Sequence, residues 1–151
     1  FKLQKLGVDV AVYRDDGLAA SKFSPQKTEN IKKKICAIFD DLKLKIIITA
    51  NLKIVDFLDI TLDLTLGTYR PYSKPNDKPL YVNKQSNHPP NLTKNIPGGI
   101  NKRISDNSSN KEIFDEAAPK YQKVINEAGY DYTFKYEPPN PQKQNNSKKI
   151  Q

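Results

Sequence analysis

The apolar residues of this chain repeat with two different spacings, which restricts the fold to one that mixes strands and helices. In residues 8–13 and 56–66 β-branched or aliphatic side chains occupy every second position, as in a strand with one buried face. In residues 28–42 and 110–128 apolar side chains recur every three or four positions, as in an amphipathic helix. The order predicts an α+β fold, with a hairpin, a packed helix, more antiparallel strands and a helical C-terminal part.

Turn and breaker residues refine these elements. The Asp16-Gly17 step predicts a hairpin, because Gly tolerates the positive φ of a tight turn. One face of that hairpin is expected to meet a core through its valines, Val8, Val10 and Val12. Further strands are predicted at residues 45–49, 56–66, 68–72 and 132–136. Helices are predicted at residues 91–96, 99–105 and 110–128, and Pro119 is expected to kink or divide the last of these.

Prolines and composition divide the chain into four predicted parts. Residues 1–75 contain the hairpin, the first helix and the later strands, and residues 76–90 form a proline-rich connection. Residues 91–136 form a helical segment. Residues 137–151 are a Gln-, Asn- and Lys-rich tail, expected to be disordered because it cannot bury enough apolar surface.

Charge and composition exclude several classes of protein. The 25 Lys and Arg outnumber the 17 Asp and Glu, and this net charge of +8 predicts a polyanionic partner. No run approaches the roughly 18 apolar residues of a membrane span, so no membrane partner is expected. One Cys and one His exclude a disulfide framework and a Cys/His zinc site, and Cys36 suits a reducing, intracellular location in the cytoplasm or nucleus. The chain begins at Phe1 without any Met, so we expect it to be a piece of a longer protein.

Asp15 and Asp16 are the residues most suited to chemistry. Two adjacent carboxylates on a rigid turn repel each other unless a divalent cation lies beside them. Carboxylate oxygens are hard ligands of the kind that Mg²⁺ or Mn²⁺ prefers. The same residues are also common in turns for local hydrogen-bonding reasons, so a purely structural Asp-Asp-Gly turn remains an alternative.

The string Val10-Ala11-Val12-Tyr13-Arg14-Asp15-Asp16-Gly17 resembles the Tyr-x-Asp-Asp box of reverse transcriptases. Later blocks are similar to the late-palm and connection sequences of retroelement reverse transcriptases, particularly Penelope-like and related animal elements: Asp56-Phe57-Leu58-Asp59-Ile60, Tyr69-Arg70-Pro71-Tyr72-Ser73-Lys74-Pro75 and Ser86-Asn87-His88-Pro89. The similarity continues more weakly through residues 100–105, where that family has its thumb. It spans about residues 8–135, so it implies the C-terminal part of a polymerase palm, followed by a small helical thumb.

The resemblance implies RNA-directed DNA synthesis by two-metal nucleotidyl transfer. Asp15 and Asp16 match the box aspartates that bind Mg²⁺ or Mn²⁺, and Tyr13 matches the tyrosine near the primer end. The implied partners are an RNA or DNA template with a DNA primer, and deoxynucleotides in the full-length enzyme. Lys102 and Arg103 fall in the thumb-like segment, where basic side chains would contact phosphates. An ordinary solvated helix face is the alternative for these two residues.

An expected part of the active site is missing from the sequence. In reverse transcriptases a further metal-binding aspartate precedes the hairpin, and Asp9 cannot replace it because it shares a strand with Asp15. We therefore expect the chain to be inactive by itself. Lys53 is a candidate proton donor to pyrophosphate, although a solvated loop lysine is favoured, and His88 is expected in a structural turn. Two other readings remain open: a non-catalytic nucleic-acid-binding remnant of a retroelement, and a structural or interaction module.

Overall fold

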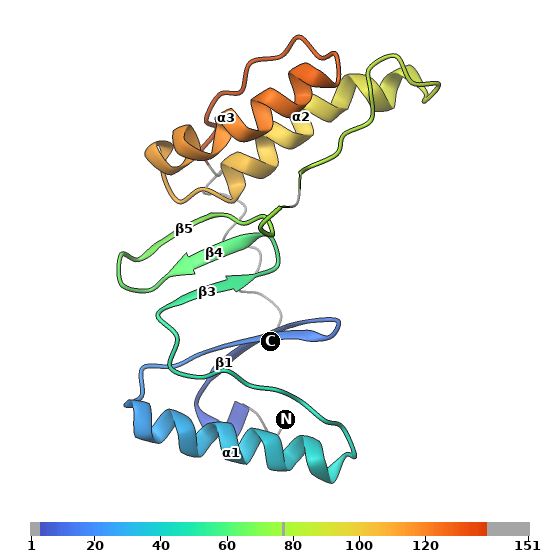
Figure 1. The fold of residues 1–151 in the computed structure, drawn as a ribbon. Coiled ribbons are helices and arrows are strands. Elements are labelled where there is room, and N and C mark those ends of the chain that lie inside the picture. Colours follow the sequence, from blue (N-terminus) through green and yellow to red (C-terminus); the bar gives the residue numbers. More distant parts are fainter. Residues whose placement is uncertain (1–3, 77, 139–151) are drawn as a thin grey trace. The chain divides into compact units, whose positions relative to one another are not determined.

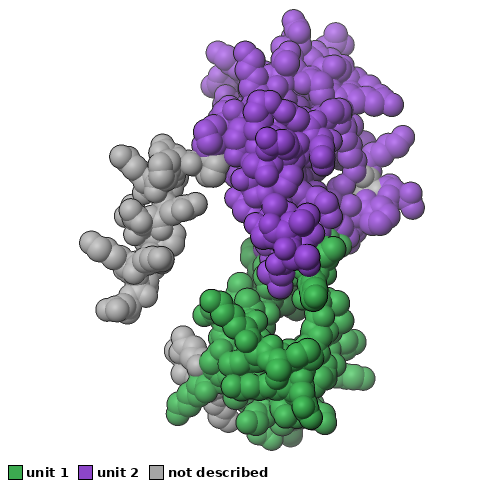
Figure 2. Space-filling model, turned by 90° about the vertical axis from the view of Figure 1, so that its left-hand side faces the viewer, with its two compact units in different colours: residues 1–57 green, residues 58–151 purple. Residues whose placement is uncertain are grey.

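The computed structural model describes residues 4–76 and 78–138 and consists of two compact units, Phe1–Phe57 and Leu58–Gln151 (Figures 1 and 2). The described part is α+β, as predicted, with two small antiparallel sheets and three α-helices. Most of the predicted polar tail, residues 139–151, lies outside the described residues.

Unit 1 contains the predicted hairpin and the first predicted helix. After a short 3-10 helix, η1 (Gln4–Leu6), come the paired strands β1 (Asp9–Tyr13) and β2 (Asp16–Ala20). Helix α1 (Pro25–Asp41) starts where expected, because the Ser24 side chain accepts a hydrogen bond from the Lys27 N–H and proline occupies the first turn. Ile31 is buried, and the other apolar residues of its stripe are half-buried except Leu42, which is exposed.

The turn of the hairpin differs from the prediction. Tyr13 pairs directly with Asp16, so the loop is Arg14-Asp15, and Arg14 takes the positive φ of 51°. Gly17 instead lies in β2 opposite Val12. In this register each strand has five paired residues. The expectation that the valines meet a core is wrong for Val10 and Val12, because every residue of β1 is exposed and Val12 retains 70% of its accessible surface. Val8, which precedes the strand, is half-buried.

No strand forms at residues 45–49, where one was predicted. The segment lies between two residues in the left-handed region, Lys43 (φ 58°) and Asn51 (φ 61°). Its sequence favours a strand, but neither of the two sheets in the described residues includes it. The prediction of a strand is therefore wrong, because this segment has no paired neighbour.

The predicted strand at residues 56–66 is a hairpin instead. Strands β3 (Ile54–Phe57), β4 (Ile60–Asp63) and β5 (Thr68–Pro71) form a sheet in that order. The chain reverses at Leu58-Asp59, where Leu58 has a φ of 54°. In a two-residue hairpin the residues that flank the loop lie on the same face, so the alternation of side chains shifts by one position. Accordingly, Val55 and Phe57 are half-buried before the turn, and Ile60 and Leu62 are half-buried after it. The prediction of a single strand overlooked this shift. The predicted hairpin partner at residues 68–72 is confirmed as β5, antiparallel to β4.

Besides β4 and β5, unit 2 contains two long helices, α2 (Pro90–Asp106) and α3 (Lys111–Glu127). The prediction of two pieces at 91–96 and 99–105 is wrong, because α2 continues through Pro97-Gly98-Gly99. Pro97 is buried while both glycines are exposed, so burial of the apolar side of α2 offsets the weak helix propensity of this stretch. Helix α3 likewise continues through Pro119 without being divided. No helix in the described ranges is long and apolar enough to cross a membrane.

The core of unit 2 lies between α2, α3 and the segment that follows α3. Its buried members are Ile100, Ile104, Phe114, Ile125, Ala128, Tyr130 and Phe134. Helix α3 ends as expected before Gly129, which has a φ of 86°. The predicted strand at residues 132–136 does not form; this segment runs along the two helices without a strand partner (Figure 1). Its backbone is hydrogen-bonded by side chains instead.

Candidate functional site

The three hairpin residues predicted to carry chemistry lie together at the tip of β1 and β2. Tyr13 and Asp16 are directly opposite each other, and Asp15 lies between them in the two-residue loop. All three are exposed, and Tyr13 retains 52% of its accessible surface. The Arg14 guanidinium lies 5.6 Å from the centre of the Tyr13 ring, a cation–π distance. The tip therefore presents two carboxylates beside an exposed aromatic ring.

The donor chemistry of this tip suits a hard divalent cation. Asp15 and Asp16 offer carboxylate oxygens, and Mg²⁺ is commonly held by one or two carboxylates together with water or substrate phosphate. Within the described residues, no group of three or more His, Cys, Asp or Glu side chains could hold a metal ion. Asp9 lies at the opposite end of the hairpin, paired with Ala20, and four strand residues span about 13 Å. Asp9 was expected to share a strand with Asp15, but β1 ends at Tyr13 and Asp15 lies beyond it in the loop.

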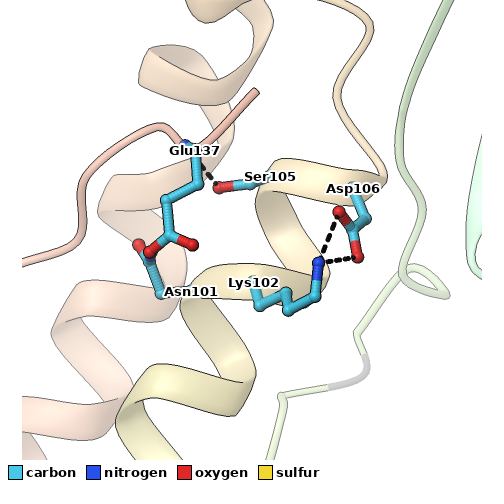
Figure 3. Close-up of polar contacts among 5 residues, drawn as sticks. All are labelled: Asn101, Lys102, Ser105, Asp106 and Glu137. Atoms are coloured by element: carbon cyan, nitrogen blue, oxygen red, sulfur yellow. Dashed lines mark hydrogen bonds and ion pairs between the residues drawn. The ribbon is translucent and has the colours of Figure 1, made fainter. Parts of the chain in front are cut away.

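The two basic residues predicted to contact nucleic acid lie on α2 in unit 2, and each pairs with an acidic residue. Lys102 Nζ lies 2.8 Å from Asp106 Oδ2, and this hydrogen bond raises the pKa of the lysine (Figure 3). Arg103 Nη2 lies 2.7 Å from Asp59 Oδ2. The Lys102 and Arg103 side chains retain 58% and 61% of their accessible surface. They are therefore accessible to phosphate, but a phosphate would compete with the carboxylates.

Arg103 also lies beside two partly buried tyrosines. Burial raises the pKa of Tyr81 and of Tyr121, and the charge of Arg103 opposes the increase at both. All three side chains line a small pocket of unit 2 together with Asp59 and Asn107. Its lining residues come from α2, from α3 and from segments that precede both helices in the chain. Nothing in the sequence pattern had indicated it, because the tyrosines are 40 positions apart.

A buried polar network on α2 was also missed by the sequence reasoning. Asn101 and Ser105 have no accessible surface, although they are polar. Asn101 Oδ1 accepts a hydrogen bond from the Lys135 N–H (2.8 Å), and Ser105 Oγ accepts one from the Glu137 N–H (3.1 Å; Figure 3). The available signal was their spacing of four residues, next to Ile100 and Ile104 on the apolar side of the helix.

Gln122 on α3 holds the same segment from the other side. Its amide Nε2 donates to the Tyr132 carbonyl (2.6 Å), and its Oε1 accepts from the Phe134 N–H (3.0 Å). A side-chain amide has the same donor and acceptor as a peptide group, so Gln122 takes the place of a neighbouring strand residue. The segment after α3 is consequently fixed by side chains of both helices.

Lys53 and His88 lie where a solvated loop lysine and a turn residue were predicted. Lys53 is exposed just before β3. His88 lies in a turn region, where its Nδ1 is 2.9 Å from Ser86 Oγ. Neither residue belongs to the acidic tip.

No protein family, curated protein or solved structure matches the chain. The function must therefore be inferred from the chain's own residues and their positions. That geometry brings Tyr13, Asp15 and Asp16 together on one turn in unit 1, and it places Lys102 and Arg103 consecutively on α2 in unit 2.

Proposed function

We propose that this chain is part of an RNA-directed DNA polymerase, a reverse transcriptase of a retroelement. The observation that supports this most strongly is the hairpin tip, where Asp15 in the loop and Asp16 at the start of β2 are adjacent and exposed beside Tyr13. Helix α1 follows this hairpin directly. The resemblance to the Tyr-x-Asp-Asp box assigns the same three residues to metal binding and to the primer end.

In this proposal Asp15 and Asp16 hold Mg²⁺ or Mn²⁺ through their carboxylates. The bound cation would neutralise charge on the phosphates of the incoming deoxynucleotide and help to ionise the primer hydroxyl. The chain's own contribution is to keep the two carboxylates adjacent on a turn that the five residue pairs of the hairpin support. Tyr13 offers an exposed ring to the primer terminus.

Lys102 and Arg103 are proposed to bind the phosphates of the template–primer duplex. Both side chains are more than half exposed, and they extend from consecutive positions of a helix that belongs to a packed core. The chain's net charge of +8 favours association with any polyanion. Phosphate contacts of this kind position a duplex without reading its sequence.

Manganese relaxation provides the first test. Paramagnetic Mn²⁺, added in small amounts to the full chain, is expected to broaden the NMR signals of the hairpin tip. Asp15→Asn and Asp16→Asn should each reduce that broadening, because each removes one carboxylate. Asp9→Asn is the matched control, since it removes an exposed carboxylate from the other end of the same hairpin. Equal effects of all three variants would contradict a site at the tip.

Primer extension provides the second test. The chain by itself is expected to extend no primer, because a further metal-binding aspartate is required. Mg²⁺-dependent synthesis that disappears in Asp15→Asn would overturn this expectation.

A second candidate is a nucleic-acid-binding remnant without catalytic function. It is favoured by the exposure of Lys102 and Arg103 on α2, since these side chains could bind a duplex whether or not the acidic tip binds metal. Binding of an RNA–DNA duplex that weakens steeply with salt, without Mn²⁺ broadening at the tip, would support this candidate. Weak and salt-insensitive binding would instead support a structural module.

A further inference from the structure

Unit 1 has almost no apolar core. Among its described residues, 4–57, Ile31 on α1 is the only buried apolar side chain, and 8% of its surface remains accessible. Large apolar side chains elsewhere in the unit are exposed: Val12 retains 70% of its accessible surface, Leu44 53% and Ile47 91%. Because burial of apolar surface is the main force that stabilises a fold, little opposes the unfolding of unit 1.

Unit 2 has a much larger core. Between α2, α3 and the segment after α3, the side chains of Ile104, Phe114 and Ile125 each keep at most 2% of their accessible surface. Side chains of both helices also bind the backbone of the segment after α3. Local stability rises with the number of buried apolar contacts, so the free energy of opening should be higher in unit 2 than in unit 1.

The hairpin and α1 depend on one another for their stability. Every residue of β1 is exposed, and in β2 only Leu18 is half-buried. A hairpin of two strands is at best marginally stable by itself. Helix α1 has 17 residues, and a helix of this length takes most of its stability from packing of its apolar face. Neither element is therefore expected to persist once the other has unfolded.

We propose that β1, β2 and α1 open together as one cooperative unit, while α2 and α3 stay folded. The chain then alternates between a closed and an open form of unit 1. Tyr13 lies opposite Asp16 only in the closed form, because their pairing depends on the hairpin. The opening does not require a metal at the tip, but any ligand that needs the formed hairpin would shift the population towards the closed form.

Native-state hydrogen exchange of the full chain, followed residue by residue by NMR, tests the proposal. Relative to their rates in an unfolded chain, the hydrogen-bonded amides of β1, β2 and α1 should exchange at least about 100-fold faster than those around Ile104 and Ile125. They should also be protected to a similar degree, since one opening exposes them all. Equal protection of the two sets would overturn the proposal.

Removal of a helix cap tests whether the hairpin and α1 open together. Ser24→Ala removes the side chain that accepts a hydrogen bond from the Lys27 N–H, and it should speed exchange about fivefold in the hairpin as well as in α1. Asn110→Ala is the matched control, because Asn110 Oδ1 accepts the corresponding bond from the Ile113 N–H at the start of α3. This control should leave exchange in the hairpin unchanged. Faster exchange confined to α1 in Ser24→Ala would contradict a common opening.

A stabilising substitution gives the reverse test without any risk to the fold. The first turn of α1 contains no acidic residue, and Gln26 is exposed there. Gln26→Glu places a negative charge near the positive end of the helix dipole, so it should slow exchange about two- to fivefold in α1 and in the hairpin alike. Exchange in α3 should not change. Slower exchange in α1 with no change in β1 and β2 would show that the two open separately and would overturn the proposal.

Discussion

Asn101 and Glu137 are 36 residues apart in the sequence, yet the Asn101 side-chain amide donates a 2.7 Å hydrogen bond to the Glu137 carboxylate. Asn101 has no accessible surface, and its carbonyl oxygen accepts a second hydrogen bond from the Lys135 N–H. The nitrogen and the oxygen of the Asn101 amide therefore both bind the segment that follows α3. This makes Asn101 the most informative position for testing the fold of unit 2.

We predict that Asn101→Ala destabilises the protein by about 2 to 4 kcal/mol, because it removes two hydrogen bonds and leaves a cavity. Urea unfolding followed by circular dichroism would measure the change. Asn95→Ala is the matched control, since Asn95 is exposed on the same helix, and it should alter the free energy of unfolding by less than about 0.5 kcal/mol. Similar losses in the two variants would show that the buried amide has no special role.

Substitutions at Gly98 and Gly99 are expected to raise the free energy of unfolding. A Cβ added at either position would meet nothing within 4 Å, and neither glycine has a positive φ. Replacing each by Ala should stabilise α2 by about 0.5 to 1 kcal/mol, through higher helix propensity and a less flexible unfolded chain. Thermal unfolding would detect the increase. Gly129→Ala should be destabilising, because Gly129 has a φ of 86°; stabilisation there would contradict the structure.

Stability should fall in alkaline solution through Tyr81 and Tyr121. Burial raises the pKa of both phenols above their usual value of about 10. The unfolded chain therefore loses these protons at lower pH than the folded chain, so their contribution to stability is complete below about pH 10 and is lost as pH rises through the folded pKa values.

The free energy of unfolding, measured between about pH 9 and 11.5, should fall less steeply in Tyr121→Phe than in the parent chain. Tyr13→Phe is the comparison, because Tyr13 is 52% exposed on the hairpin. A larger flattening by Tyr13→Phe than by Tyr121→Phe would contradict the assignment.

The ion pair between Arg103 and Asp59 gives a test of duplex binding that is separate from stability. Exposed pairs contribute about 0 to 1 kcal/mol, so Asp59→Asn should barely alter unfolding. It should release Arg103 and strengthen binding to an RNA–DNA duplex several-fold at low salt. Arg103→Ala should weaken binding and lower the salt slope by about 1, whereas Arg70→Ala, at an exposed position on β5, should do neither.

A charge control completes that test. Asp131→Asn also removes one exposed negative charge from unit 2, but Asp131 is not the partner of Arg103. Fluorescence anisotropy across a salt series would compare the variants. If Asp131→Asn strengthens binding as much as Asp59→Asn does, the effect comes from net charge and Arg103 has no distinct role.

Periodicity was sufficient to predict α1 and α3. Residues 25–41 and 111–127 follow the apolar stripes closely, because each helix buries one face and has a capping side chain, Ser24 or Asn110. The strand prediction failed at Leu58-Asp59, where a tight reversal shifts the alternation by one position and the prediction overlooked the shift. The helix prediction failed at residues 97–99, where burial of Pro97 outweighs the propensity of the three residues to end a helix.

The candidate site was predictable in part for similar reasons. Asp15 and Asp16 are adjacent in the sequence, so local turn chemistry was enough to place them together. The exact turn was not predictable, because the pairing of Tyr13 with Asp16 depends on the register of the whole hairpin. The partners of Lys102 and Arg103 were not anticipated; Asp59 is 44 positions before Arg103, and no local pattern connects the two. The metal-binding and nucleic-acid roles remain predictions.

The segment after α3 receives its backbone partners from Asn101, Ser105 and Gln122, not from a strand. A strand pairing depends on main-chain groups that every residue except proline carries, so it tolerates most substitutions. Here each bond depends on the identity of one side chain, and a single base change can remove it. In a gene that is no longer under selection, random mutations should therefore detach the segment after α3 early, while the apolar core of unit 2 is still intact.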